Sequence, residues 1–186
     1  MQPEANPHTS QQYDAVINEC KTLFAQKTHD YGTAWRVLRT ISIVDQIYIK
    51  AQRIRTIQKK KMQLIGDSIR SEFIGIINYA VIGLIQLQLP GNAPEELAET
   101  KAVDLYITQI AAAKQLMQSK NHDYGEAWRS MSQESFVDLI LMKLQRIRQI
   151  IANEGKTLVS EGIDANYFDI INYGVFALIL LNEKES

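Results

Sequence analysis

Two histidines of this chain each precede an aspartate, and both pairs lie in the same short motif. The motif reads KTHDYGTAWR in the first half of the chain and KNHDYGEAWR in the second half, 93 residues later. His29-Asp30 and His122-Asp123 therefore occupy equivalent positions. A neighbouring aspartate can orient an imidazole ring and tune its pKa, as general acid and base catalysis requires. These four residues are the candidate catalytic groups.

Basic residues flank both copies of this motif. The lysine and the arginine at its two ends could attract a phosphate group through charge-assisted hydrogen bonds. The candidate ligand-binding residues of the motif are Lys27, Arg36, Lys120 and Arg129. The alternative is that the motif forms only a turn between helices, in which the aspartate bonds local backbone and the aromatic residues fill the core.

A second basic pattern follows each motif at the same distance. Lys50 and Arg53 are three residues apart, as are Lys143 and Arg146, so each pair shares one face of a helix. Such a pair could clamp the phosphate of a nucleotide. The alternative is that these cations form ion pairs with nearby aspartates of the chain.

Two acidic residues differ between the halves in an informative way. Glu72 lies in an E-x-x-G pattern, whereas the aligned residues of the second half read N-x-x-D and end at Asp169. Carboxylates three residues apart on a helix can hold Mg²⁺, which prefers oxygen ligands. Glu72 and Asp169 could thus converge on one shared metal site, or each half could hold an incomplete site.

The motif belongs to a much longer internal repeat. Residues 27–55 align with 120–148 without a gap, and 17 of the 29 pairs are identical. After a one-residue insertion, the sequence I-I-N-Y also recurs. The repeat of about 80 residues is longer than the usual solenoid unit of roughly 20 to 50 residues, which favours two packed copies. The helices of these two copies must therefore position the candidate catalytic and ligand-binding residues.

This repeat predicts the domain organisation. We expect an N-terminal tail at 1–10, a first helical repeat at 11–89, a linker at 90–95 and a second repeat at 96–182. The linker reads PGNAPE, which breaks helices. The two repeats are expected to form one globular domain.

Each repeat is predicted to contain three helices, with a short helical turn after the first. The first helix is expected at about 10–28. The second should begin at Ser42 or Ser135, in an S-x-x-D pattern typical of a capping box, and the third near Asp67 or Asp164. No segment alternates between apolar and polar residues as a strand does. The expected fold is all-α, with two three-helix units packed as a pseudo-two-fold bundle around the apolar third helices.

The composition bears on the partners and the location of the protein. Lys and Arg total 20 and Asp and Glu total 21, so there is no general positive charge to attract nucleic acid, and we expect no direct DNA binding. The single cysteine, Cys20, and the absence of a visible secretory signal favour the cytoplasm.

The third helices raise the question of a membrane. Residues 73–89 carry no formal charge, which approaches the length of a membrane span. The second copy contains Asp169 in the aligned segment, and both copies have a central Asn-Tyr pair. These features favour buried helices of a soluble fold without membrane contact, whose apolar faces leave room for a homo-oligomer.

The pattern K-x-H-D-Y-G-x-A-W-R, followed by D-x(4)-K-x-x-R-I-R and I-I-N-Y, resembles a known bacterial and phage family. This is the domain of unknown function 1599, also called nucleotide modification associated domain 1. The resemblance covers both copies and implies a link to nucleotide metabolism or modification, without a catalytic assignment. By the family pattern, Tyr31 and Tyr124 join the candidate ligand-binding residues, beside the lysines and arginines named above.

A second similarity is to the MazG-type all-α nucleoside triphosphate pyrophosphohydrolases. That family binds Mg²⁺ through E-x-x-E on one helix and E-x-x-D on the next. Only a divided E-x-x-D is present in this chain, and the second helix has no E-x-x-E in either copy. This departure puts a pyrophosphohydrolase activity in doubt.

Two functional hypotheses follow. The first is a cytoplasmic protein that binds a nucleotide or another phosphorylated small molecule, with Mg²⁺ as a potential cofactor and hydrolysis of a phosphate bond as the reaction if the protein is an enzyme. The second is a non-catalytic scaffold or assembly protein in which the repeated polar residues form a buried structural network.

Overall fold

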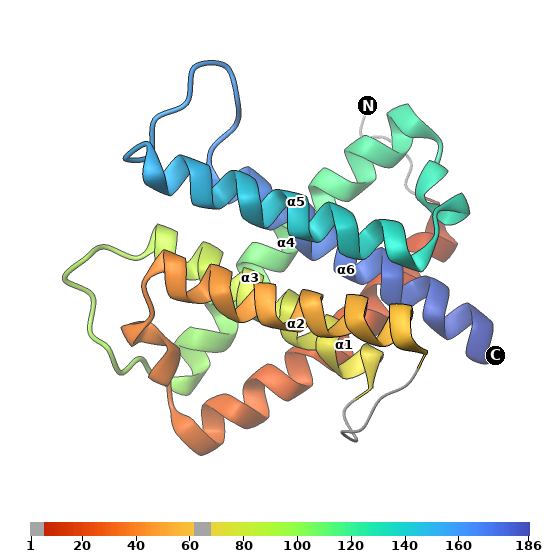
Figure 1. Cartoon of the computed structure of the whole chain (residues 1–186). Helices are drawn as coiled ribbons and strands as arrows, with labels where there is room; N and C mark the ends of the chain where they lie inside the picture. The colour runs from red at the N-terminus through yellow and green to blue at the C-terminus, as the bar shows by residue number, and fades with distance from the viewer. Residues whose placement is uncertain (1–5, 62–67) are drawn as a thin grey trace.

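The computed structural model describes residues 6–61 and 68–186, and in these ranges it contains six α-helices, two 3-10 helices and no strand (Figure 1). Repeat one forms α1 (Pro7–Tyr31), η1 (Ala34–Val37), α2 (Thr40–Lys60) and α3 (Ile69–Gln88). Repeat two forms α4 (Glu99–Tyr124), η2 (Ala127–Ser130), α5 (Gln133–Ala152) and α6 (Ile163–Glu185). The prediction of an all-α fold with a short helical turn in each repeat is confirmed.

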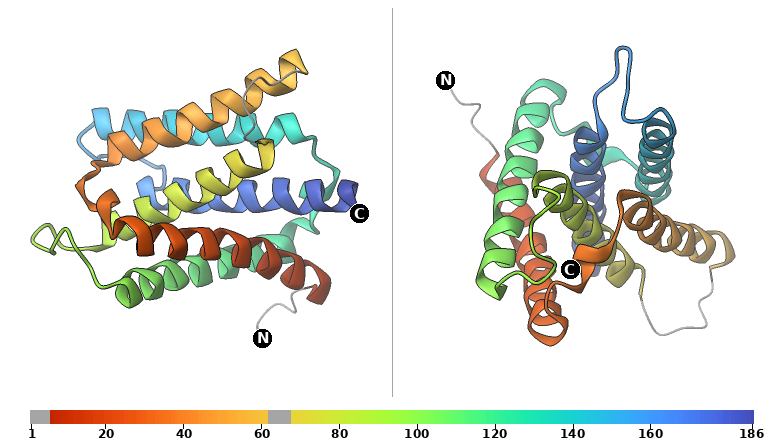
Figure 2. Two further views of the ribbon diagram at one scale, coloured as in Figure 1. Left: turned by 90° about the horizontal axis from the view of Figure 1, so that it is seen from below. Right: turned by 90° about the vertical axis from the view of Figure 1, so that its left-hand side faces the viewer.

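Equivalent helices of the two repeats pack against each other in three layers (Figure 2). The apolar α3 and α6 form the middle layer, α2 and α5 cover one side, and α1 and α4 cover the other. Because each helix meets its own counterpart, the repeats are related by a pseudo-two-fold axis. Buried side chains from all six helices form one continuous core, so the repeats fold as a single unit.

A pair of buried tyrosines and a pair of buried asparagines join the repeats in a symmetric way. The Tyr13 hydroxyl donates to Asn172 Oδ1 at 2.8 Å, and the Tyr106 hydroxyl donates to Asn78 Oδ1 at 2.7 Å. Each asparagine also donates from Nδ2 to a carbonyl oxygen of the first helix in its own repeat, that of Cys20 at 3.0 Å or that of Ala113 at 3.1 Å. The asparagine of I-I-N-Y thus ties three helices together.

Charged pairs join α2 to α5 on the opposite side of the molecule. Arg148 donates to Asp45 Oδ1 at 3.0 Å, and at the equivalent place Arg55 lies 3.8 Å from Asp138 Oδ1. Both carboxylates are more than half exposed, so each pair contributes at most about 1 kcal/mol. These aspartates serve contacts between repeats and do not cap the second helices.

The second helices begin earlier than predicted. α2 begins at Thr40 after Arg39, and α5 begins at Gln133 after Ser132, whose hydroxyl accepts a hydrogen bond from the Ser135 amide. The expected starts at Ser42 and Ser135 were wrong because both serines already lie inside the first turn of their helices.

The third helices begin near the predicted positions, at Ile69 and Ile163. Ser68 caps α3, with its hydroxyl accepting the Ser71 amide, while Gly162 precedes α6 and Asp164 lies in its first turn. The other expected cap, Asp67, lies outside the described residues. A serine that was not considered therefore replaces an aspartate at the start of α3.

The two most apolar helices, α3 and α6, are long and apolar enough to cross a membrane by length and composition alone. In the structure, 61% of the apolar window of α3 and 72% of that of α6 are buried inside the protein. These helices therefore form the middle layer of the core, as predicted, with their apolar side chains packed on neighbouring helices.

Candidate functional site

The HDYG motif lies at the C-terminal end of the first helix in each repeat. His-Asp-Tyr forms the last turn of α1 or α4, and the glycine that follows has a positive φ, +60° for Gly32 and +61° for Gly125. Glycine adopts this conformation at low steric cost, so it ends the helix and turns the chain into η1 or η2. The first helix is therefore longer than the predicted range 10–28, and three residues of the motif are helical.

A cleft of about 420 Å³ opens beside this motif in repeat one. Its walls come from α1, η1, α2 and α3. The aromatic and large apolar residues of the lining are Leu23, Phe24, Tyr31, Trp35, Tyr79 and Ile82. The size falls within the range of about 300 to 1,000 Å³ that is usual for small-molecule sites, which are mostly apolar with a few polar groups.

Two lysines and one glutamate supply charge to the cleft. Lys27 is exposed and forms no hydrogen bond or ion pair with any residue that the structure describes, whereas Lys50 Nζ lies 3.6 Å from Glu72 Oε2. Glu72 is buried and accepts a hydrogen bond of 2.6 Å from Arg53. Three cations against one carboxylate leave the region positive, which favours an anionic ligand.

Gly75 lines the cleft directly beside the Lys50 side chain. A Cβ atom at this position would lie 2.8 Å from Lys50 Cε, closer than such contacts occur. The glycine therefore leaves the space through which Lys50 passes to reach Glu72.

Repeat two places a carboxylate where repeat one has this glycine. Asp169 aligns with Gly75, and its two oxygens accept hydrogen bonds of 2.7 Å from Lys120 and 2.7 Å from Lys143. These lysines are the counterparts of Lys27 and Lys50. The aspartate of repeat two thus bridges the two lysines whose counterparts line the cleft of repeat one.

A second difference concerns the aromatic wall. Phe176 aligns with Ile82 and stacks on Trp128, with ring centroids 4.2 Å apart and planes inclined by 5°. Trp128 is buried, whereas its counterpart Trp35 is partly exposed and lines the cleft. Repeat two therefore has a carboxylate and an aromatic ring where repeat one has Gly75, over which Lys50 passes, and Ile82.

Electrostatics at Asp169 follow from these contacts. Burial favours the neutral carboxyl, but hydrogen bonds from Lys120 and Lys143 outweigh burial and lower the pKa of Asp169. For Lys120, burial favours the neutral amine, and the bond to Asp169 again outweighs it and raises the pKa of the lysine. Both groups are therefore held in their charged forms.

We expect Asp169→Asn to lower the free energy of unfolding by about 2 kcal/mol at neutral pH, because it leaves the buried Lys143 without its carboxylate. A lowered carboxyl pKa stabilises the fold above the unfolded value of about 3.9, and this stabilisation is lost as the pH falls through the folded value. The difference between the two proteins should therefore shrink below about pH 4. Urea unfolding at several pH values measures it, and a difference that grew on acidification would contradict the assignment.

The four candidate catalytic residues lie outside the cleft. His29 and Asp30 are exposed at the end of α1, where His29 Nδ1 lies 3.4 Å from Glu99 Oε2. His122 and Asp123 are exposed at the end of α4, with His122 Nδ1 3.2 Å from Asp123 Oδ1. None of the four belongs to the residues that line the cleft. Their catalytic role stays a prediction that this geometry does not support.

Arg36 contacts the linker between the repeats. Its guanidinium group donates to the carbonyl oxygens of Ala93 at 3.1 Å and Pro94 at 3.2 Å and also bonds the side chain of Gln86. The arginine therefore attaches the linker to η1 and α3, and these bonds occupy it without a ligand.

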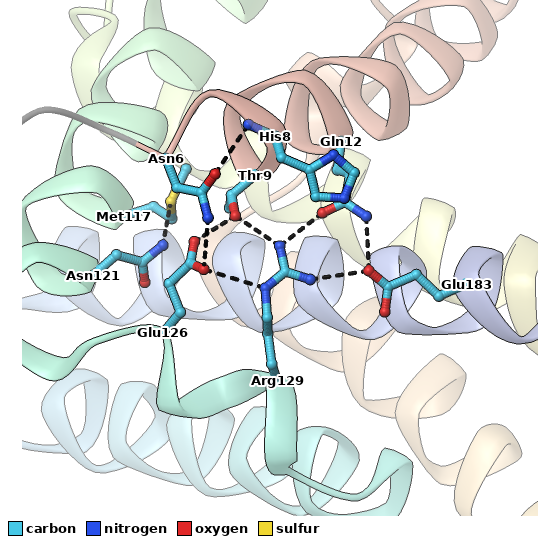
Figure 3. A network of polar contacts seen from close by, with 9 residues as sticks. All are labelled: Asn6, His8, Thr9, Gln12, Met117, Asn121, Glu126, Arg129 and Glu183. Carbon is cyan, nitrogen blue, oxygen red and sulfur yellow. Dashed lines mark hydrogen bonds and ion pairs between the residues drawn. The ribbon is translucent and has the colours of Figure 1, made fainter.

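Arg129 makes the corresponding contacts with the other end of the chain (Figure 3). Its guanidinium group donates to Thr9 at 2.6 Å, Gln12 at 2.7 Å, Glu183 at 2.9 Å and Glu126 at 3.3 Å. The network holds the start of α1 against η2 and the end of α6. Each HDYG turn is thus fastened to the segment that leads into the first helix of the other repeat.

Arg146, the counterpart of Arg53, lies in different surroundings. Asn166 replaces Glu72 and donates to the Gly162 carbonyl, so Arg146 is exposed, with its Nη2 3.9 Å from Met142 Sδ. It lines a wider hollow of about 1,230 Å³ between α5 and residues 153–161. This hollow is larger than the cleft of repeat one, but it is bounded by an exposed loop and contains no residue of the HDYG motif.

Glu72 and Asp169 belong to separate groups of charges. Each carboxylate is bonded to cations of its own repeat, Glu72 to Arg53 and Asp169 to two lysines. Within the described ranges, no three His, Cys, Asp or Glu side chains are placed to hold a metal ion. The residues present do not fit the shared Mg²⁺ site that the sequence suggested.

Sequence reasoning found the lysines, Tyr31 and Glu72, but it did not find Trp35 or Ile82. The tryptophan entered only in the alternative that the motif forms a turn, as a residue of the core, and Ile82 was not considered. The alignment of the repeats contained the information that could have identified Ile82, because this isoleucine aligns with a phenylalanine, Phe176, in the second copy.

One comparison with known proteins gives a match. A family model described as nucleotide modification associated domain 1 matches residues 27–87 and again 120–181. The two matches together span more than half of the chain and coincide with the two repeats. No curated protein and no solved structure gives a significant match.

Proposed function

Because this chain belongs to the nucleotide modification associated domain 1 family and carries two tandem copies of the domain, we propose that repeat one binds a nucleotide or a similar phosphorylated small molecule in the cleft beside its HDYG motif. The observation that carries the proposal is the lining of this cleft. Aromatic side chains lie beside Lys27 and Lys50, a combination suited to a planar base and a phosphate.

The aromatic residues are placed to contact a base. Trp35 is partly exposed in the wall of the cleft, and Tyr31 is 72% exposed at its rim. A base stacked on an aromatic side chain gains about 1 to 3 kcal/mol. Binding in this cleft would cover both rings.

The scaffold hypothesis explains a different set of residues in the same motif. Arg36, Arg129 and the buried Asn78 and Asn172 fasten segments of the chain together and need no ligand. They leave the cleft residues unexplained, because the side chains of Lys27 and Tyr31 form no hydrogen bond or ion pair with any residue of 6–61 or 68–186. We therefore assign the structural role to the arginines and asparagines and the binding role to the cleft.

Chemistry beyond binding receives less support from the geometry. Among the described residues that line the cleft, Glu72 is the one carboxylate, and Arg53 and Lys50 contact it. The proposal is accordingly limited to binding, and any Mg²⁺ would arrive with the nucleotide.

Equivalent tyrosines of the two repeats provide a matched test. Tyr31→Ala should weaken nucleotide binding about tenfold, because it removes one stacking surface at the rim of the cleft. Tyr124 is equally exposed, at 75%, but lies beside the repeat in which Asp169 and Phe176 fill the corresponding places. Tyr124→Ala should change affinity by less than about twofold.

The measurement is isothermal titration calorimetry with a panel of nucleoside mono-, di- and triphosphates, with and without Mg²⁺. Because both tyrosines are exposed, neither variant should change the melting temperature of the free protein appreciably. Equal losses of affinity in the two variants, or no heat of binding from any nucleotide at millimolar concentration, would contradict the proposal.

A further inference from the structure

Repeat two holds an anion between two lysines, and that anion is part of the protein. The carboxylate of Asp169 accepts 2.7 Å hydrogen bonds from both Lys120 and Lys143. In repeat one the same two lysine positions are occupied, but the residue between them is Gly75. Lys27 consequently lacks, among the described residues, the partner that its counterpart Lys120 has.

We propose that Asp169 is a built-in substitute for the anionic group of the ligand, and that in repeat one a phosphate monoester binds between Lys27 and Lys50 above Gly75. This inference rests on the proposed function, since it names where and how the ligand of that cleft is held.

The charges of Lys27, Lys50 and Glu72 favour a phosphate monoester as the ligand. Lys50 and Lys27 both line the cleft, and Glu72 lies closer to Arg53, at 2.6 Å, than to Lys50, at 3.6 Å. A phosphate monoester carries a charge of about −1.5 to −2 at neutral pH, which two lysines balance. The longer phosphate chain of a triphosphate would need further cations.

The aromatic side chains extend the comparison to the rest of the ligand. Phe176 places a ring flat against Trp128, whereas Trp35 is partly exposed and lines the cleft together with Ile82. In repeat two, one helix thus supplies both a carboxylate for the lysines and a ring for the tryptophan. A molecule that supplies both to repeat one has an aromatic ring and a single phosphate, and a nucleoside monophosphate has both.

Substitutions at Gly75 and Lys27 in repeat one test the inference. Gly75→Asp gives repeat one its own carboxylate, and it should weaken binding of adenosine monophosphate at least tenfold because the ligand's phosphate must now compete. Gly75→Ala, which adds only the Cβ that pushes Lys50 aside, is the control and should weaken binding less than Gly75→Asp. Lys27→Gln removes the exposed cation on the other side of the proposed phosphate site, and it should weaken binding by a similar factor without disturbing the fold. Calorimetric titration of the full chain measures the affinity of each variant.

Asp169→Gly makes the opposite change in repeat two. It leaves Lys120 and Lys143 without their carboxylate. Inorganic phosphate at about 10 mM, which is well above a millimolar dissociation constant, should therefore raise the melting temperature of this variant more than that of the wild type. Chloride at equal ionic strength is the control. Adding Lys120→Ala to Asp169→Gly should abolish the difference.

The possible results separate the two proposals. No binding of any nucleotide to the wild type, together with phosphate stabilisation of Asp169→Gly, would overturn the proposed function but support the equivalence of the lysine pairs. Binding to the wild type that Gly75→Asp and Lys27→Gln leave unchanged would overturn the inference alone. The inference is also overturned if phosphate and chloride affect Asp169→Gly equally.

Discussion

Asn172→Ala is expected to lower the free energy of unfolding by about 3 kcal/mol. The substitution removes the acceptor of the buried Tyr13 hydroxyl, which is left without a partner in the core, and the second donor to the Ala113 carbonyl, which keeps its backbone bond inside α4. An unsatisfied buried group costs about 1 to 3 kcal/mol, and the cavity left by the asparagine side chain adds to this cost. Chemical denaturation, followed by circular dichroism, measures the effect.

The pseudo-two-fold arrangement provides an internal comparison. Asn78→Ala breaks the equivalent bonds to Tyr106 and Cys20 and should lower stability by a similar amount. Asn18→Ala, on the exposed face of α1, should change it by less than about 0.5 kcal/mol. If Asn172→Ala and Asn18→Ala had equal effects, the asparagine of I-I-N-Y would not join the repeats as described.

Ile82→Phe is expected to weaken nucleotide binding at least thirtyfold, a loss of about 2 kcal/mol. The substitution gives repeat one the residue of repeat two, where Phe176 stacks on Trp128. A ring against Trp35 would occupy the part of the cleft that we assign to the base. Calorimetric titration gives the affinity, and thermal unfolding shows whether the variant folds.

Phe176→Ile is the matched control for this variant. It removes the ring from Trp128 and should destabilise repeat two, but it should leave nucleotide affinity within about twofold because the cleft of repeat one is untouched. A folded Ile82→Phe protein that bound nucleotide like the wild type would show that the ligand does not contact the face of Trp35.

Much of the fold could be predicted from the sequence because the duplication constrains it. Apolar residues at helical spacing and the absence of strand patterns indicated an all-α fold, and the two uncharged segments indicated the central helices α3 and α6. Helix starts were less predictable, since Ser42 and Ser135 fit a cap as well as the true starts do. Hydrogen bonds between backbone and side chains decide between such neighbouring positions, and a pattern of residue types does not contain them.

The candidate site was only partly predictable for a related reason. The matched residues of the repeats include both those that bind other parts of the chain, such as Arg36 and Arg129, and those that line the cleft, such as Lys27 and Tyr31. Identity between the repeats does not separate these roles, because both preserve the same residues. The differences between the repeats, Gly75 against Asp169 and Ile82 against Phe176, identify the repeat that is open.

The most direct test of this account is the number of nucleotides that one chain binds. Isothermal titration calorimetry of the wild-type protein with a nucleoside monophosphate should give one site per chain, since repeat one has neither the carboxylate of Asp169 nor the ring of Phe176. Two equivalent sites per chain would contradict the assignment of different roles to the two repeats. The absence of any binding would contradict the central claim itself.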